Sequence, residues 1–124
     1  MKMYCPHATS FDFVSEWYEP LRDVSFTEDL VLPHESTDEQ FPSREFLTSG
    51  ECDLVVAEVS YPSLGLGIEL GWASMEEVPI VAMYRSGSRP SGAVYAVTDR
   101  VIEYQDENDL LDKITEIYGE FKGE

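Results

Sequence analysis

Long apolar runs and cysteine are scarce in this 124-residue sequence. No apolar run approaches the roughly 18 to 20 residues of a membrane-spanning helix, and the first residues lack the apolar segment of a signal peptide. We therefore expect a cytoplasmic protein that does not interact with a membrane. The two cysteines, Cys5 and Cys52, lie far apart and follow no metal-binding spacing. This favours two buried thiols over a disulfide or a metal site.

Basic residues are also few, 8 against 25 acidic ones, which gives a formal net charge of −17. Such a surface repels phosphate backbones and anionic lipid heads, so we expect neither a nucleic-acid polymer nor a membrane as partner. A small anionic ligand remains compatible with this charge, because backbone N–H groups at a helix N-terminus can hold a phosphate. An acid-rich, lysine-poor surface is also compatible with a high-salt cytoplasm.

Length and composition predict a single domain over residues 1–124. One hydrophobic core typically serves about 100–150 residues. The chain has the material for such a core, since 43% of its residues are hydrophobic and 12% are aromatic. No internal repeat or low-complexity linker marks a domain boundary.

Short apolar segments alternate with segments of helical periodicity. Apolar residues at three- and four-residue steps predict helices near 13–21 and 110–121, with weaker helices at 43–50 and 68–76. Strands are predicted near 1–5, 30–32, 53–59, 79–84 and 101–104. This alternation predicts an α/β fold, a doubly wound (Rossmann- or flavodoxin-like) and mostly parallel sheet of about five strands with helices on both faces. Such folds bind ligands at the carboxyl ends of the strands.

The segment 61–71, which reads YPSLGLGIELG, follows the most apolar predicted strand and leads into a predicted helix. Gly65 and Gly67 allow a tight turn and a close approach of a ligand to the backbone. Ser63 can add a hydroxyl to the free N–H groups of the first helical turn, so this segment can hold an anion. A tight strand-to-helix connection without any ligand is an equally good interpretation.

Glu69 is predicted in the first turn of that helix, where the helix dipole stabilises the ionised carboxylate. An ionised carboxylate beside a bound sugar is a nucleophile. A first-turn glutamate can also serve only to complement the dipole, and spacing alone favours this structural role.

The segment 53–73, DLVVAEVSYPSLGLGIELGWA, resembles the nucleoside 2-deoxyribosyltransferase family, as do Pro79 and Ile80 and the Arg85 that closes the next strand. Within that family it is most similar to the 2'-deoxynucleoside 5'-monophosphate N-hydrolases, and the similarity extends over about residues 45–92. It implies an enzyme without metal or organic cofactor that acts on a small nucleoside or nucleotide.

The resemblance also implies roles for individual residues. Glu69 matches a nucleophile that attacks the anomeric C1' carbon and forms a covalent deoxyribosyl-enzyme, as in retaining glycosidases. Ser63 matches a serine that holds the 5'-phosphate, a task that the Gly65 and Gly67 amides would share. Tyr4 matches a tyrosine that positions the nucleophile or the sugar, although a tyrosine packed in the core is the alternative.

The sequence differs from the family pattern at two positions. Glu45 stands where an aspartate is usual, so it is either a proton donor to the leaving base or an exposed helix residue. The string Pro6-His7-Ala8-Thr9-Ser10 replaces a Gly-Ser-Ile-Arg-like string that contacts phosphate. His7, Thr9 or Ser10 can substitute for those contacts.

A partner subunit would complete the site in these hydrolases, which implies a homodimer. Its phosphate-binding serine lies in the loop after the strand ending at Arg85, where Ser88 and Ser91 are the candidates. Two other residues carry open alternatives. His34 either touches base or phosphate or is a loop histidine without function. Glu58 either binds a sugar hydroxyl or is a buried acid paired with Arg85.

The sequence thus favours an enzyme that cleaves the N-glycosidic bond of a (2'-deoxy)nucleoside 5'-monophosphate and releases the free base. A base-exchanging deoxyribosyltransferase acting on unphosphorylated nucleosides is the first alternative, because basic residues that would hold a phosphate are few. A nucleotide-binding module without turnover is the second alternative, because Glu45 replaces the usual aspartate.

Overall fold

A five-stranded parallel sheet forms the centre of the computed structural model, which describes residues 1–34 and 41–123. The strand order is β2-β1-β3-β4-β5, and every neighbouring pair is parallel. The strands are β1 (Met3–Tyr4), β2 (Leu30–Val31), β3 (Leu54–Glu58), β4 (Ile80–Arg85) and β5 (Val101–Tyr104). The α/β class, the number of strands and their parallel direction were all predicted from the sequence and are confirmed.

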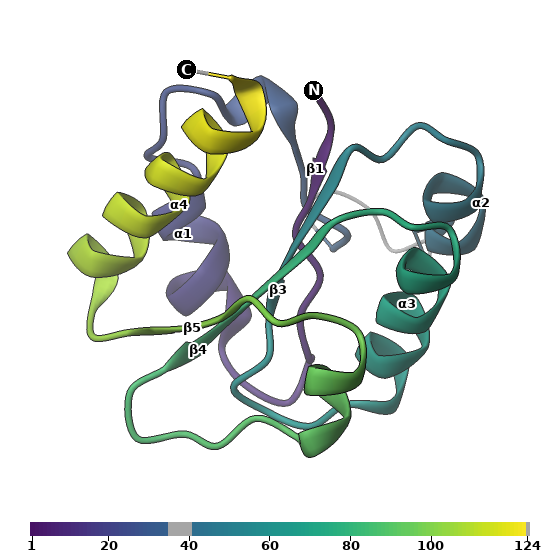
Figure 1. The fold of residues 1–124 in the computed structure, drawn as a ribbon. Helices are drawn as coiled ribbons and strands as arrows, with labels where there is room; N and C mark the ends of the chain where they lie inside the picture. The colour runs from purple at the N-terminus through teal and green to yellow at the C-terminus, as the bar shows by residue number, and fades with distance from the viewer. Residues whose placement is uncertain (35–40, 124) are drawn as a thin grey trace.

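Helices cover both faces of this sheet, as predicted (Figure 1). One face is covered by the π-helical turn η1 (Val14–Tyr18), by α1 (Glu19–Leu21), which continues it, and by α4 (Glu107–Lys122). The other face is covered by α2 (Ser43–Thr48), α3 (Leu64–Met75) and the 3-10 turn η3 (Gly92–Ala96). A second 3-10 turn, η2 (Thr27–Asp29), leads into β2.

Strand β3 separates two layers of core. Leu54 and Val56 pack with α1 and α4, whereas Val55 and Ala57 pack on the side of α2 and α3. All five residues of β3 are buried, which confirms its predicted central place. Burial on both faces explains why the strand is apolar without alternation.

The start of α3 differs from the sequence prediction. The helix begins at Leu64 rather than near residue 68, because the Ser63 Oγ accepts a hydrogen bond from the Leu66 N–H at 3.3 Å and caps it. Gly65 and Gly67 lie inside the helix without positive φ, so their predicted role in a tight turn is wrong. Glu69 lies in the second helical turn, where the dipole acts more weakly than in the predicted first turn.

Both cysteines are buried free thiols, as predicted. Over the described ranges, no helix has the length and apolar character needed to cross a membrane.

The chain leaves β1 toward β2 on one side of the sheet, while β3 lies on the other side of β1. The direction of winding therefore reverses between β1 and β3. In open α/β sheets such a reversal leaves a crevice at the carboxyl ends of the two strands. Tyr4, the last residue of β1, lies at this crevice, and the connection from β3 to α3 begins beside it.

Candidate active site

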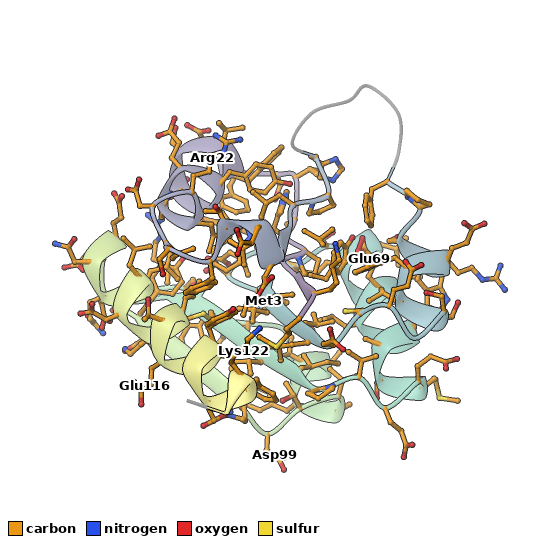
Figure 2. All side chains as sticks on the ribbon, turned by 90° about the horizontal axis from the view of Figure 1, so that it is seen from above. Met3, Arg22, Glu69, Asp99, Glu116 and Lys122 are labelled. Atoms are coloured by element: carbon orange, nitrogen blue, oxygen red, sulfur yellow. The ribbon has the colours of Figure 1, made fainter. Side chains whose placement is uncertain are left out.

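A cavity of about 250 Å³ lies at the carboxyl ends of β1 and β3. Seven of the candidate site residues named from the sequence line it, together with four residues that the sequence did not single out. The lining consists of Tyr4, His7, Thr9, Pro33, His34, Phe41, Ser43, Ser63, Gly65, Leu66 and Glu69. In Figure 2, Glu69 lies on the side of the molecule occupied by α2 and α3, whereas Glu116 and Asp99 project from the periphery.

Tyr4 and Glu69 form the chemical centre of the cavity. The Tyr4 hydroxyl donates a hydrogen bond to Glu69 Oε2 at 2.5 Å. Burial raises the pKa of the Glu69 carboxyl above its ordinary value, and the Tyr4 hydrogen bond lowers it in part. Burial and the neighbouring carboxylate raise the pKa of the Tyr4 phenol, which stays protonated near neutral pH. Tyr4 can therefore orient the Glu69 carboxylate but cannot act as a base.

Aromatic rings hold Tyr4 in place. The Tyr4 side chain is fully buried, and the Phe41 ring stacks against it with centroids 5.5 Å apart. The Phe46 ring lies on the same residue at 5.7 Å. Phe41 and Ser43 were not predicted as site residues, and nothing in their local sequence distinguishes them from an ordinary helix start.

His7 lines the cavity but is fully engaged within the protein. Its Nδ1 donates to the Ala8 carbonyl at 2.7 Å, which leaves Nε2 to accept from the Tyr18 hydroxyl at 2.7 Å. The Tyr18 oxygen in turn accepts the His34 backbone N–H at 2.8 Å. Burial lowers the pKa of His7 to about 4, so the ring is neutral at pH 7. The prediction that His7 binds phosphate is therefore not supported by this geometry.

The capped start of α3 offers neutral donors to a ligand. Ser63 uses its Oγ as an acceptor, so its hydroxyl proton remains available for donation. The Gly65 N–H belongs to the first helical turn, which has no acceptor within the helix. The Gly67 N–H differs, because it donates to the Ser63 carbonyl at 3.1 Å. The predicted role of the Gly67 amide in binding an anion is thus not supported.

Glu45 does not reach the cavity that contains Glu69. It is exposed on α2 and lines a separate hollow together with Lys2 and Glu51. Ser43 lines the Glu69 cavity, and two residues along an α-helix correspond to about 200° of rotation. The helix therefore turns Glu45 away, and the structure does not support it as the proton donor to the leaving base.

Ser88 and Ser91 also lie outside this chain's own cavity. The Ser88 hydroxyl donates to the Arg85 carbonyl at 2.7 Å, and Ser91 caps η3 by accepting from Ala93 at 3.3 Å. Ser91 instead lines an apolar groove of about 430 Å³ that also includes Ser63 and Gly67.

Glu58 is the buried acid that one of the two sequence interpretations describes. Burial raises its pKa, and the Arg85 charge lowers that pKa in part without a direct ion pair between the two side chains. It is not part of the cavity lining, and its carboxylate accepts hydrogen bonds from the Ser60 N–H and the Tyr104 hydroxyl. Arg85 forms its ion pair with Glu16, with Nη1 and Oε1 2.7 Å apart.

The described cavity lining is poor in charge. Glu69 is its only carboxylate, and it includes no lysine or arginine. His34 is exposed at the edge of the cavity, and its ring centroid lies 5.3 Å from that of His7. Across the described residues, no cluster of three or more His, Cys, Asp or Glu side chains that could hold a metal is present. An anion bound at this lining would therefore have to be held by neutral donors and by His34.

No protein-family model matches the chain. Three curated proteins, each provisionally named 2'-deoxynucleoside 5'-phosphate N-hydrolase 1, are similar to it. The Syntrophotalea carbinolica protein is 50% identical over 38 residues, which are 31% of this chain and 27% of the relative. The Thermofilum pendens protein is 32% identical over 69 residues, which are 52% of this chain and 48% of the relative. The Methanosarcina barkeri protein is 29% identical over 83 residues, which are 64% of this chain and 52% of the relative. The matches thus span about half or less of these relatives.

A solved structure has the same fold. The CMP N-glycosidase BcmB of Clostridium botulinum superposes with a TM-score of 0.60 at 20% sequence identity, over 92% of this chain and 99% of that one. The predicted similarity to the 2'-deoxynucleoside 5'-monophosphate N-hydrolases is confirmed by the three relatives.

Proposed function

We propose that this protein cleaves the N-glycosidic bond of a (2'-deoxy)nucleoside 5'-monophosphate and releases the free base and a sugar phosphate. The observation that carries the proposal is the hydrogen bond between Tyr4 and Glu69 at the edge of the sheet where α/β folds bind ligands. The names of the similar proteins support the same chemistry.

In the first step, Glu69 attacks the anomeric carbon. The Tyr4 hydroxyl donates its hydrogen bond to Oε2 of Glu69. No other described side chain donates to this carboxylate, so Oε1 can approach C1'. A bond forms between C1' and the carboxylate as the C1'–N bond breaks, and its electron pair leaves with the base. The base takes up a proton from water or from His34, which lies at the cavity edge.

In the second step, water attacks C1' of the glycosyl-enzyme. The bond between C1' and the Glu69 oxygen breaks, which restores the carboxylate and releases the sugar phosphate. The proton that the attacking water loses passes to His34 or to bulk water, which replaces the proton taken up by the base in the first step. The raised pKa of Glu69 means that a fraction of the enzyme is protonated in weak acid, and this fraction cannot attack.

The 5'-phosphate would be held by neutral groups. The Ser63 hydroxyl and the Gly65 N–H lie at the positive end of the α3 dipole, and Thr9 adds a hydroxyl from the loop after β1. This assignment retains the sequence-based roles of Ser63 and Gly65 and excludes the engaged Gly67 amide.

Base release from a panel of deoxynucleotides, ribonucleotides and unphosphorylated nucleosides tests the proposal, with each substrate measured by chromatography. Release from monophosphates, and a mass increase of the protein by one glycosyl phosphate on rapid acid quenching, would support it. Tight binding without release from any substrate would overturn it in favour of a nucleotide-binding module.

A base-exchanging transferase for unphosphorylated nucleosides is the second candidate. The absence of lysine and arginine from the described lining favours it, because a dianionic phosphate would meet Glu69 without a compensating cation. Transfer of labelled free base into nucleoside faster than loss of base to water would establish the transferase.

We also propose a homodimer. Leu64 is 83% exposed and Ile68 is 45% exposed on the rim of the apolar groove that contains Ser63 and Ser91. A second copy that covers this groove would bring its own loop 86–91 near the Glu69 cavity. Light scattering coupled to gel filtration, with Ile68→Glu as the disrupting variant, tests this proposal.

A further inference from the structure

A buried carboxylate lies beside the cavity without lining it. Glu58, the last residue of β3, is 1% exposed and stands on the face of the sheet opposite α3, next to Tyr104. Its Oε1 accepts the Ser60 N–H at 2.6 Å, and its Oε2 accepts the Tyr104 hydroxyl. Both carboxylate oxygens are therefore satisfied within the protein, and neither is offered to a ligand.

The bond to Ser60 fixes the direction in which the chain leaves the sheet. Ser60 is itself buried, and its Oγ accepts the Arg85 N–H at 2.8 Å from the end of β4. Two side-chain bonds thus anchor one residue of the turn between β3 and α3. Three residues later Ser63 caps the helix that carries Glu69.

The backbone of Glu58 fixes the other wall of the cavity. Its N–H donates to the Pro6 carbonyl at 3.0 Å, and Glu58 and His7 form an isolated parallel bridge. The segment after β1, which carries His7 and Thr9, is thereby tied to the same residue. Glu58 connects the two segments whose relative placement sets the distance between Tyr4 and Glu69.

We propose that Glu58 is a positioning residue of this active site: it holds the turn between β3 and α3 so that Glu69 meets Tyr4. The proposal rests on the proposed function for its kinetic readout. An apolar residue of similar volume would avoid the desolvation of a buried carboxylate. It would also leave the buried Ser60 N–H without an acceptor and would loosen the turn.

Three variants separate positioning from stability. Glu58→Met removes the acceptor while filling the space, and Glu58→Gln restores an acceptor for Ser60. Tyr104→Phe is the matched control, because it removes the bond to Oε2 and leaves the bond to Ser60. Each variant is measured for kcat and KM in base release, for thermal unfolding, and for amide hydrogen exchange over residues 60–67.

We expect Glu58→Met to remain folded, to lose kcat by about tenfold or more with KM nearly unchanged, and to exchange faster over 60–67. Glu58→Gln and Tyr104→Phe should keep kcat within about threefold of the parent. Parental kcat and exchange in a folded Glu58→Met variant would overturn the proposal.

Two further outcomes are separable. If Glu58→Met does not fold, the Ser60→Ala variant replaces it, because it removes the second anchor of the turn. This variant should lower kcat at constant KM, and parental kinetics in it would overturn the proposal.

If the parent itself releases no base, the proposed function fails. Faster exchange over 60–67 in Glu58→Met than in Tyr104→Phe would still support the positioning role, and equal exchange would overturn it.

Discussion

The Tyr4 hydroxyl lies 2.5 Å from Glu69 Oε2, although 65 positions separate the two residues in the sequence. Tyr4 is fully buried at the end of β1, where its ring contacts the Phe41 and Phe46 rings, and Glu69 lies on α3. The rigid partner therefore sets the orientation of the carboxylate. Such preorganisation is what a nucleophile needs in order to attack a carbon held about 3 Å away.

Glu69→Gln should lower the rate of base release by at least about three powers of ten, because the amide cannot form the glycosyl-enzyme. The fold should be retained, since the substitution removes a partly buried charge without changing volume. Calorimetric binding of substrate to the variant checks that the cavity is intact. Measurable turnover near the parental rate would exclude Glu69 as the nucleophile.

Tyr4→Phe should move the acid limb of kcat/KM to higher pH. The Tyr4 hydrogen bond lowers the pKa of Glu69, so its removal lets burial raise that pKa further, and protonation inactivates more enzyme at a given acidic pH. We also expect kcat at neutral pH to fall about tenfold through loss of orientation. A pH profile from 4 to 8 measures both effects. An acid limb that stays in place would show that another group titrates.

Ser63→Ala should act on both stability and substrate affinity. Loss of the helix cap should cost about 1 kcal/mol, and Ser63→Gly should cost only a few tenths. Both variants should raise KM for monophosphates more than for nucleosides, because both lack the hydroxyl. Asp106→Ala, which removes the cap of α4, is the control for a cap outside the Glu69 cavity and outside the proposed dimer groove. Equal effects on both substrate classes would place the phosphate elsewhere.

Glu45→Gln should leave kcat within about twofold, because Glu45 is exposed in a hollow separate from the Glu69 cavity. Steady-state kinetics on the best substrate of the panel provide the measurement. A loss of a hundredfold would show that α2 rearranges on substrate binding and brings this carboxylate to the leaving base.

His7 should make the fold sensitive to mild acid. Its pKa falls from 6.5 to about 4 in the folded state, so the unfolded chain binds a proton that the folded protein excludes between these values. Stability contributed by neutral His7 is complete above pH 6.5 and is lost as the pH falls toward 4, by up to about 3 kcal/mol. Urea unfolding at several pH values should show a weaker pH dependence in His7→Gln. The His34→Gln variant should keep most of the parental pH dependence, because burial, the largest cause of the lowered His7 pKa, is unchanged and only the smaller effect of the His34 charge is lost.

Sequence reasoning recovered the elements of the fold because most signals are local. The apolar run of β3 and the periodicity of α4 depend on burial patterns that a few neighbouring residues reveal. The start of α3 was placed too late, because Gly65 and Gly67 have low helix propensity and suggest a loop. The cap provided by Ser63 outweighs that propensity.

The site was recovered less evenly. Glu69, Ser63 and Tyr4 were predicted through a resemblance to a family, and the structure places them in one cavity. The engagement of His7 by Tyr18 was missed, because a tyrosine on a helix face is indistinguishable in sequence from an ordinary core residue. The rotation of α2 that turns Glu45 away depends on the register of the helix against the sheet, which no local pattern encodes.

The charge of the cavity changes during the proposed reaction, because Glu69 is the single carboxylate of the described lining. While the sugar is attached to Glu69, the ester is neutral and an anionic phosphate is tolerated beside it. Hydrolysis restores a negative charge in a half-buried setting without a neighbouring cation in that lining, so the charged product is repelled as soon as it forms. Departure of the sugar phosphate would then need no opening motion of the fold, and added salt would slow product release rather than chemistry.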